Sequence, residues 1–263
     1  MSETGKARRL ARMFNAQSGR MLCLAFDHGM QVGTVRGIED PARVLDAAAE
    51  AGVDAVILNP GMMVRHGHRL AGGPAAILRI DQTDMWRQGG PFAYPDVHQR
   101  LVSSVEEAVS LGAEAVITYL FTCNGRPEEE TRSFEICGAV SAACRRWGVV
   151  HVIEAMAARG GFARPEDPDV IALNCRMAGE LGADVVKTDS CADLGRLSAI
   201  ASQSLAPIAI AGGPAREGSA AVRAFAQDMI AAGAKGLMFG RNVFEQPDVR
   251  ATLVALRETV HGS

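Results

Sequence analysis

Apolar and polar positions along the chain repeat as a unit in which a helix end, a glycine turn and a short apolar strand follow one another. A glycine closes each helix, and a run of β-branched and apolar residues begins shortly after it. The clearest copies are 51–58 (AGVDAVIL), 111–119 (LGAEAVITY), 181–188 (LGADVVKT) and 232–239 (AGAKGLMF). They are spaced about two βα units apart, a βα unit being roughly 30 residues, so further strands are expected between them.

Other apolar segments supply these strands, and amphipathic segments predict the helices. The additional strands are expected at 21–26, 75–80, 149–154 and 206–211. Helices are expected at 39–51, 103–111, 127–146, 168–181, 217–232 and 248–260. Ser103 and Glu106 have the spacing of a capping box at the start of one of them. Apolar strands that alternate with helices predict a parallel sheet covered on both faces.

Eight strands and about eight helices in one chain of this length favour the α/β class and a closed (β/α)8 or TIM barrel, in a single domain. An open doubly wound sheet is the alternative. A GxGxxG motif after the first strand would favour it, and residues 25–33 (AFDHGMQVG) contain none. We expect residues 1–20 to form an N-terminal helical extension and residues 21–263 the barrel catalytic domain.

Composition narrows the functional classes. Hydrophobic residues make up 48% and charged residues 22% of the chain, and the net charge of −3 gives no basic surface for nucleic acid or an anionic membrane. The apolar runs are too short for a membrane span, and the charged N-terminus lacks a signal-peptide core. Six scattered cysteines without a CxxC pair are typical of buried thiols in a reducing compartment. We therefore expect a cytoplasmic protein.

The active site of a TIM barrel lies at the carboxyl ends of its strands. The residues at these ends are mostly polar or glycine: Asp27, His28, Asn59, Asp81, Asp84, Tyr119, Glu154, Lys187, Asp189, Gly212, Gly213, Gly240 and Arg241.

Lys187 is the most informative of these residues. It follows Val185 and Val186 in a buried strand, where desolvation disfavours a charged amine, and a neutral amine can attack a ketone to form a Schiff base. Only three of the 27 basic residues are lysines, and arginine cannot act as such a nucleophile. Lys6 and Lys235 lie outside the predicted site. The alternative is a lysine that reaches solvent from the strand end or pairs with Asp189.

Two glycine-bearing turns predict a phosphate site. Gly212 and Gly213 follow the seventh strand, and Gly240 and Arg241 follow the eighth, where TIM barrels commonly bind phosphate. Arg241 would add a charge-assisted hydrogen bond. The alternative is that these glycines only permit tight turns.

Asp27, Glu154 and His28 are candidates for proton transfer beside Lys187. Either carboxylate would orient the lysine or exchange protons with the reacting groups, and the histidine titrates near neutral pH. A structural role in loop or core hydrogen bonds is the alternative for each of them.

A metal site is the rival chemistry. His66 and His68 are two residues apart, so on a helix they would face different directions, and no third ligand is evident. We therefore expect neither a metal nor another cofactor.

Four motifs together resemble the archaeal-type class I fructose-bisphosphate aldolase family. They are AFDHGM at 25–30, LGADVVKTDS at 181–190, IAIAGGP at 208–214 and GLMFGRNVFEQP at 236–247. The same family is similar to the aminodideoxyheptulosonate synthases and the autoinducer-2 phosphate thiolase. The resemblance implies a (β/α)8 fold, Lys187 as the Schiff-base lysine, Asp27 as an acid/base residue and phosphate at the two glycine turns. It also implies a homo-oligomer, often a decamer.

The chain departs from that family after the fifth strand. Fructose-bisphosphate members carry a Tyr-Pro-Arg-Gly run there, with the tyrosine as proton donor, whereas Ala157 stands at that position here. The thiolase branch also lacks the tyrosine. A glutamate at the end of this strand looks more like the related tagatose-bisphosphate aldolases, so Glu154 is our candidate substitute.

The sequence thus predicts a class I aldolase, a metal-independent aldehyde-lyase of carbohydrate metabolism. It would cleave or form a carbon–carbon bond in a phosphorylated ketose or related carbonyl compound. One alternative is a thiolase-like acyl transfer to coenzyme A that uses Lys187 and His28. The other is a non-catalytic barrel that binds a sugar phosphate.

Overall fold

Eight parallel strands close into a barrel in the computed structural model, which describes residues 3–87, 93 and 98–262. Neighbouring strands follow the order β1-β10-β9-β8-β7-β6-β3-β2, and β1 pairs with both β10 and β2. The strands are β1 (Met21–Ala25), β2 (Ala55–Leu58), β3 (Ala75–Arg79), β6 (Ala115–Thr122), β7 (Val150–Ala157), β8 (Val185–Thr188), β9 (Ile208–Ala211) and β10 (Gly236–Phe239). The predicted (β/α)8 fold is confirmed.

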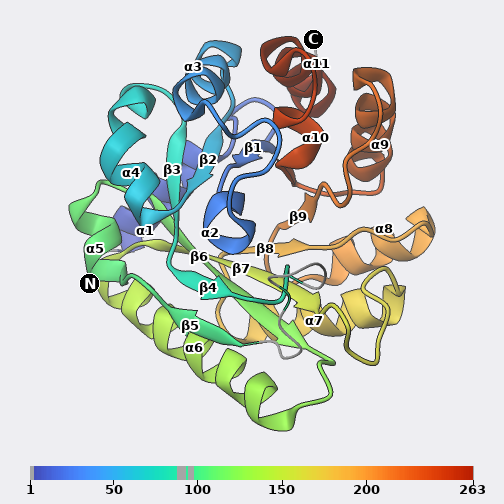
Figure 1. Ribbon diagram of the computed structural model, residues 1–263. Coiled ribbons are helices and arrows are strands. Elements are labelled where there is room, and N and C mark those ends of the chain that lie inside the picture. The colour runs from blue at the N-terminus through green and yellow to red at the C-terminus, as the bar shows by residue number, and fades with distance from the viewer. Residues whose placement is uncertain (1–2, 88–92, 94–97, 263) are drawn as a thin grey trace.

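Helices surround these strands, most of them in an outer ring (Figure 1). They are α1 (Glu3–Met13), α2 (His28–Val32), α3 (Pro41–Ala51), α4 (Pro60–His66), the 3-10 helix η1 (Gly67–Leu70), α5 (Val105–Ser110), α6 (Pro127–Trp147), α7 (Pro168–Glu180), α8 (Leu194–Gln203), α9 (Ser219–Ala231), α10 (Arg241–Phe244) and α11 (Val249–His261). The six helices expected from the amphipathic pattern are present, with ends shifted by a few residues.

Three local details differ from the sequence-based expectation. A two-stranded antiparallel ribbon, β4 (Asp81–Thr83) and β5 (Gln99–Leu101), interrupts the simple alternation after β3. Strands β6 and β7 continue three residues beyond the expected ends at 119 and 154. The cap of α5 is Ser104, whose hydroxyl accepts a hydrogen bond from the Glu107 amide, so the predicted capping box is one residue out of register.

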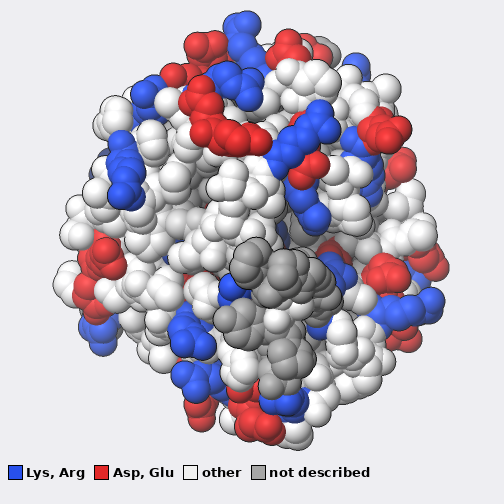
Figure 2. Space-filling view, viewed as in Figure 1, with Lys and Arg blue, Asp and Glu red and all other residues white. Residues whose placement is uncertain are grey.

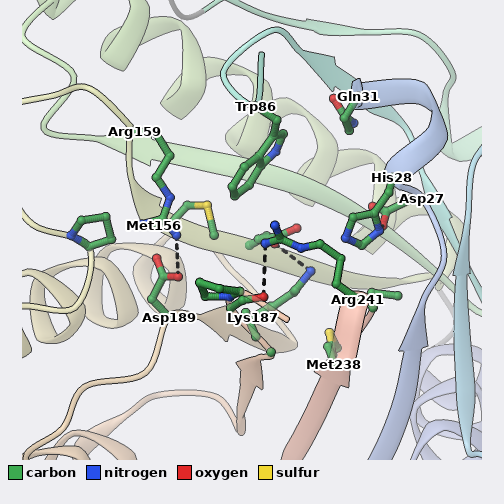
Figure 3. A pocket seen from close by; sticks show the side chains of 18 of the residues that line it. Asp27, His28, Gln31, Trp86, Met156, Arg159, Lys187, Asp189, Met238 and Arg241 are labelled. Atoms are coloured by element: carbon green, nitrogen blue, oxygen red, sulfur yellow. Dashed lines mark hydrogen bonds and ion pairs between the residues drawn. The ribbon is translucent and has the colours of Figure 1, made fainter. Parts of the chain in front are cut away.

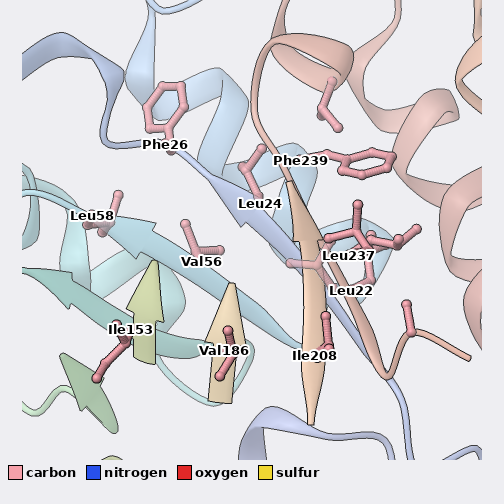
Figure 4. Packing of buried hydrophobic residues seen from close by; sticks show 14 of the residues in the cluster. Leu22, Leu24, Phe26, Val56, Leu58, Ile153, Val186, Ile208, Leu237 and Phe239 are labelled. Atoms are coloured by element: carbon pink, nitrogen blue, oxygen red, sulfur yellow. The ribbon is translucent and has the colours of Figure 1, made fainter. Parts of the chain in front are cut away.

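Two hydrophobic layers hold the barrel together because successive strand residues face opposite sides. Side chains such as Leu22, Leu24, Val186 and Ile208 face outward and pack against the helices (Figure 4). Inward-facing side chains such as Ile77 form a second cluster inside the barrel. Burying each large apolar side chain contributes about 1.5–3 kcal/mol.

Helix α1 closes the amino-terminal end of the barrel. Met13 is fully buried in the interior cluster, and α1 lies behind the strands in Figure 1. Lys6 pairs with Asp184 at 2.8 Å, and Arg12 pairs with Glu114 at 2.7 Å. The opposite end of the barrel is therefore the one that remains open.

The surface carries both signs of charge. Acidic and basic side chains are mixed around the rim of the face in Figure 2. In the described part of the chain, no helix has the length and apolar character needed to cross a membrane. The six cysteines are buried and free.

Candidate active site

The inward-facing register of four strands changes from apolar to charged at the open end. On β8, Val185 lies in the interior cluster, and Lys187 follows it two residues later with the same inward orientation. The same step leads from Ile77 to Arg79 on β3. It also leads from Val152 to Glu154 on β7 and from Ala25 to Asp27 after β1. Four charged groups therefore meet in one layer.

Lys187 and Glu154 form a buried ion pair. They are register partners on neighbouring strands, and Lys187 Nζ lies 2.7 Å from Glu154 Oε1. Only 7% of the lysine side chain and 4% of the glutamate side chain are exposed. The expected burial of Lys187 is present, and its partner is Glu154 rather than Asp189. The sequence had suggested that Glu154 lies at the end of its strand, but β7 continues three residues beyond it.

Arg79 lies at the centre of this layer and was not among the predicted site residues. Its fully buried guanidinium donates from Nε to Asp27 at 2.8 Å, from Nη1 to Asp81 at 3.2 Å and from Nη2 to Glu154. It also stacks 3.9 Å from the ring centre of Tyr119. Burial alone would lower the pKa of Arg79, but the surrounding acidic groups raise it well above its usual value. Arg79 is therefore a permanent cation that fixes three carboxylates.

Asp27 is held as a carboxylate. Burial by itself would raise its pKa, but the charges of Arg79 and Lys187 lower it to about 2. One of its oxygens accepts the hydrogen bond from Arg79 Nε. At neutral pH the group thus carries a fixed negative charge at the floor of the site.

His28 is a neutral imidazole at the edge of the same cluster. Burial is the main cause that lowers the pKa of His28 to about 4, with Lys187 and Arg241 adding to the effect against Asp27. Its Nδ1 lies 3.7 Å from Asp27 Oδ1 and has no hydrogen-bond partner among the described residues. Burial thus disfavours the charged form of this imidazole, and a part for His28 in proton transfer stays a prediction.

The two glycine turns, at 212–213 and 240–241, lie next to each other at the open end of the barrel. Asn242 Nδ2 donates to the Gly212 carbonyl at 2.8 Å, and Arg241 donates to the Gly213 carbonyl at 3.2 Å. Gly213 has a φ of 67°, which favours glycine. A Cβ on Gly240 would lie 2.3 Å from His28 Cε1, so close packing against the histidine also demands glycine there. The turns are thus rigidly fixed next to the charged cluster.

One cavity of about 810 Å³ joins these groups. Its lining includes all eight predicted site residues, namely Asp27, His28, Glu154, Lys187, Gly212, Gly213, Gly240 and Arg241. Figure 3 shows Lys187 among Asp27, His28, Trp86 and Arg241. The volume lies within the range of small-molecule sites, about 300–1,000 Å³.

Loop residues complete the cavity and had no clear signal in the sequence. Trp86 donates a hydrogen bond from Nε1 to the Tyr119 hydroxyl at 3.1 Å. Arg159 donates to Asp189 at 2.9 Å, and Arg216 donates to the Gly212 carbonyl at 2.6 Å. Burial raises the pKa of Asp189, an effect that Arg159 opposes.

Within the described ranges, no group of three or more His, Cys, Asp or Glu side chains is arranged to hold a metal ion.

Comparisons with known proteins give the family of the chain. Residues 21–246 match the family model described as DeoC/LacD family aldolase. The chain is 31% identical to the 2-amino-3,7-dideoxy-D-threo-hept-6-ulosonate synthase of Halobacterium salinarum over 99% of this chain and 93% of that protein. It is 28% identical to the class 1 fructose-bisphosphate aldolase of Thermoproteus tenax over 94% and 92% of the two chains.

A solved archaeal fructose-1,6-bisphosphate aldolase, with its catalytic lysine covalently bound to the carbinolamine intermediate of the substrate, has a similar fold. The TM-score is 0.84 and the identity 26%, over 98% of this chain and all of that chain. The family match spans most of the barrel and confirms the resemblance that the motifs indicated. The chain belongs to the DeoC/LacD family of aldolases.

Proposed function

We propose that Lys187 is the nucleophile through which this class I aldolase forms a Schiff base with a phosphorylated ketose or related carbonyl compound. The observation that carries this assignment is the ion pair of Lys187 with Glu154 at 2.7 Å, buried at the floor of the cavity. An amine must be neutral to attack a carbonyl carbon. Glu154 Oε1 is within reach of the proton that Lys187 has to release.

Glu154 then serves as the acid and base of the reaction. It takes a proton from the Lys187 ammonium, and the neutral amine adds to the carbonyl to give a carbinolamine. It returns a proton to the carbinolamine hydroxyl, which leaves as water and yields the iminium. In the cleavage direction the carboxylate accepts the proton of the substrate hydroxyl, the carbon–carbon bond breaks, and its electron pair moves into the iminium to give an enamine.

Glu154 takes the place of the family tyrosine in this scheme. Ala157, at the tyrosine position, is buried at the end of β7 and has no group that transfers protons. Arg79 is a positioning residue, because its hydrogen bond to one oxygen of Glu154 leaves the other oxygen facing Lys187. Asp27, with a pKa of about 2, stabilises the positive iminium as a fixed anion rather than donating a proton.

The phosphate of the substrate is assigned to the two glycine turns. Gly212, Gly213, Gly240 and Arg241 line the same cavity as Lys187, and the turn is fixed by Asn242 and Arg216. The iminium withdraws electrons by itself, so the reaction requires no metal. Because the bond that breaks is a carbon–carbon bond and an aldehyde is released, the enzyme is an aldehyde-lyase. His28 is assigned as a neutral hydrogen-bonding group beside the substrate. The homo-oligomeric state stays a prediction.

Borohydride reduction tests the assignment. Incubation with dihydroxyacetone phosphate and a panel of phosphorylated ketoses, followed by mass spectrometry, should place the reduced adduct on the Lys187 peptide. Glu154→Gln should lower turnover by about 10²–10⁴-fold while the adduct still accumulates with time. Glu114→Gln, at the closed end of the barrel, is the matched control. Full activity of Glu154→Gln, or an adduct on another lysine, would refute the scheme, and acyl transfer that depends on coenzyme A would point to the thiolase reaction.

A further inference from the structure

Three buried polar atoms of residues that line the cavity have no hydrogen-bond partner among the described residues. One is Nδ1 of His28, described above, and the other two are Nε2 of Gln31 and Oδ2 of Asp189. Gln31 is 4% exposed and Asp189 is 8% exposed, and both line the cavity that contains Lys187. An unpaired buried polar atom is costly in a folded protein, so each of these two requires an explanation.

The partners of the two side chains determine which atom is left over. The Oε1 atom of Gln31 accepts a hydrogen bond from the backbone N–H of Thr83 at 3.0 Å. Because a backbone N–H requires an acceptor, the amide cannot be reversed, and the unpaired atom is the NH₂ donor. The Oδ1 atom of Asp189 accepts from Arg159 Nη2 at 2.9 Å, so the unpaired atom there is an acceptor.

The two atoms belong to different walls of the site. Gln31 lies on α2, which follows β1, and Asp189 lies directly after β8, two residues beyond Lys187. In Figure 3, Asp189 lies to the left of Lys187 and Gln31 lies above it, so the two side chains are in different directions from the lysine. A carbonyl compound attached to Lys187 would therefore present one part of its chain to the donor and another to the acceptor.

We propose that the free oxygen of Asp189 accepts a hydrogen bond from a substrate hydroxyl and that Gln31 donates one to a substrate oxygen. The site thereby selects a polyhydroxylated carbonyl compound over a deoxy compound or a simple dicarbonyl. The proposal rests on the proposed Schiff-base function, because it takes the substrate to be anchored at Lys187. A neutral hydroxyl suits Asp189 because Arg159 already balances the charge of this carboxylate.

Two isosteric variants exchange the free atoms, and each also changes the charge of the side chain by one unit. Asp189→Asn keeps an oxygen for Arg159 and replaces the free acceptor with a donor. Gln31→Glu keeps an oxygen for the Thr83 amide and replaces the free donor with an acceptor. The readout is the concentration of probe that half-saturates borohydride trapping at Lys187, which requires no turnover. The probes are dihydroxyacetone phosphate, fructose 1,6-bisphosphate and analogues of each that lack one hydroxyl.

Each variant should raise the half-saturating concentration of at least one hydroxylated probe about 10- to 100-fold, the range expected for a lost hydrogen bond to a buried polar group. The matching deoxy analogue should change by less than about threefold, since it never made the bond. Equal effects on both members of every pair would indicate a general disturbance of charge and overturn the proposal. Unchanged affinities would also overturn it.

Controls separate this proposal from the one on which it rests. Asp228→Asn and Gln227→Leu replace exposed residues of α9 and should leave every affinity unchanged. If no probe is trapped at Lys187 of the unaltered protein, the Schiff-base assignment fails and the selectivity proposal falls with it. If trapping is normal and the variants do not discriminate, only the roles of Asp189 and Gln31 are wrong.

Discussion

The two ends of the barrel contain similar ion pairs with different consequences. At the closed end, Lys6 pairs with Asp184 at 2.8 Å, and about a fifth of each side chain is exposed (22% and 19%). At the open end, Lys187 pairs with Glu154 at 2.7 Å, and the exposed fractions are 7% and 4%. The pairing distance does not distinguish them. Lys187 and Glu154 line the cavity of about 810 Å³, which Lys6 and Asp184 do not, and Glu154 also binds Arg79. We therefore expect chemistry at Lys187 and not at Lys6, because Lys187 combines burial, a proton acceptor and room for a substrate.

The largest expected effect is the loss of the open-end lysine. Lys187→Met should lower turnover by at least about 10⁴-fold, because loss of the nucleophile removes the covalent pathway. Measured turnover of any ketose phosphate that the unaltered protein traps, with adduct mass spectrometry, checks this. Residual activity above a hundredth of the starting value would mean that the amine is dispensable.

A second prediction compares two inward-facing residues of β3 that differ in chemistry. Arg79→Met leaves three buried carboxylates without their counter-charge and should destabilise the fold by about 3–5 kcal/mol. Ile77→Ala, one layer below, should cost about 2–5 kcal/mol by leaving a cavity. Denaturant unfolding measures both.

Catalysis should separate these two variants although their stabilities are similar. Ile77→Ala should retain most of its turnover in conditions where it is folded, whereas Arg79→Met should lose it because Glu154 is no longer positioned. Arg79→Lys restores the charge without the fork of donors, and partial recovery of turnover is expected. If both β3 variants lose activity equally, the charge of Arg79 would have no role in catalysis beyond its contribution to stability.

The predictable parts of the molecule are those that local pattern determines. The eight strands, the six helices with predicted ranges and the burial of Lys187 follow from apolar periodicity and glycine turns, which depend on a few neighbouring residues. Strands β6 and β7 were predicted too short because Tyr119 and Glu154 look like polar ends in a sequence. In the fold they are buried by Arg79 and Lys187, which are distant along the chain.

Arg79 shows why the set of site residues predicted from the sequence was incomplete. The segment AAILRI places it two residues after Ile77, so its inward direction was readable. Its partners are Asp27 after β1, Asp81 on β4 and Glu154 on β7, and the sequence does not show that they meet at Arg79. An arginine on an apolar strand without partners would be too costly to bury. Trp86 and Arg159 lie in loops without periodicity. Their place in the cavity depends on tertiary contacts with Tyr119 and Asp189.

A third prediction concerns acid, at a histidine that faces away from the barrel interior. His151 on β7 is buried between the hydroxyl groups of Thr118 (2.9 Å) and Ser141 (2.8 Å). Burial, aided by Lys6 and Arg145, lowers its pKa from 6.5 to about 3. The unfolded chain binds a proton below pH 6.5 and the folded chain does not, so His151 costs stability as the pH falls from 6.5 towards 3, by about 1.4 kcal/mol per pH unit.

The variant His151→Gln removes this proton linkage. Between pH 7.5 and pH 5, the stability of the unaltered protein should fall by about 2 kcal/mol more than that of the variant. Denaturant unfolding at the two pH values gives this difference independently of the hydrogen bonds that the substitution changes at both. An identical fall in both proteins would mean that His151 has the same pKa in the folded and the unfolded chain.

The smallest effect is expected at the closed-end lysine and is the counterpart of the first prediction. Lys6→Met removes an ion pair that water partly screens, so it should cost about 1 kcal/mol or less, and turnover and borohydride trapping should be unchanged. Asp184 keeps a second role in the variant, because its Oδ2 accepts a hydrogen bond from the His151 amide, which limits the loss. Thermal unfolding and turnover, measured on the same preparation, check both parts. A large loss of turnover in Lys6→Met would show that the closed end of the barrel affects the site. Local burial and the neighbouring cavity would then not be enough to explain why Lys187 and Lys6 differ.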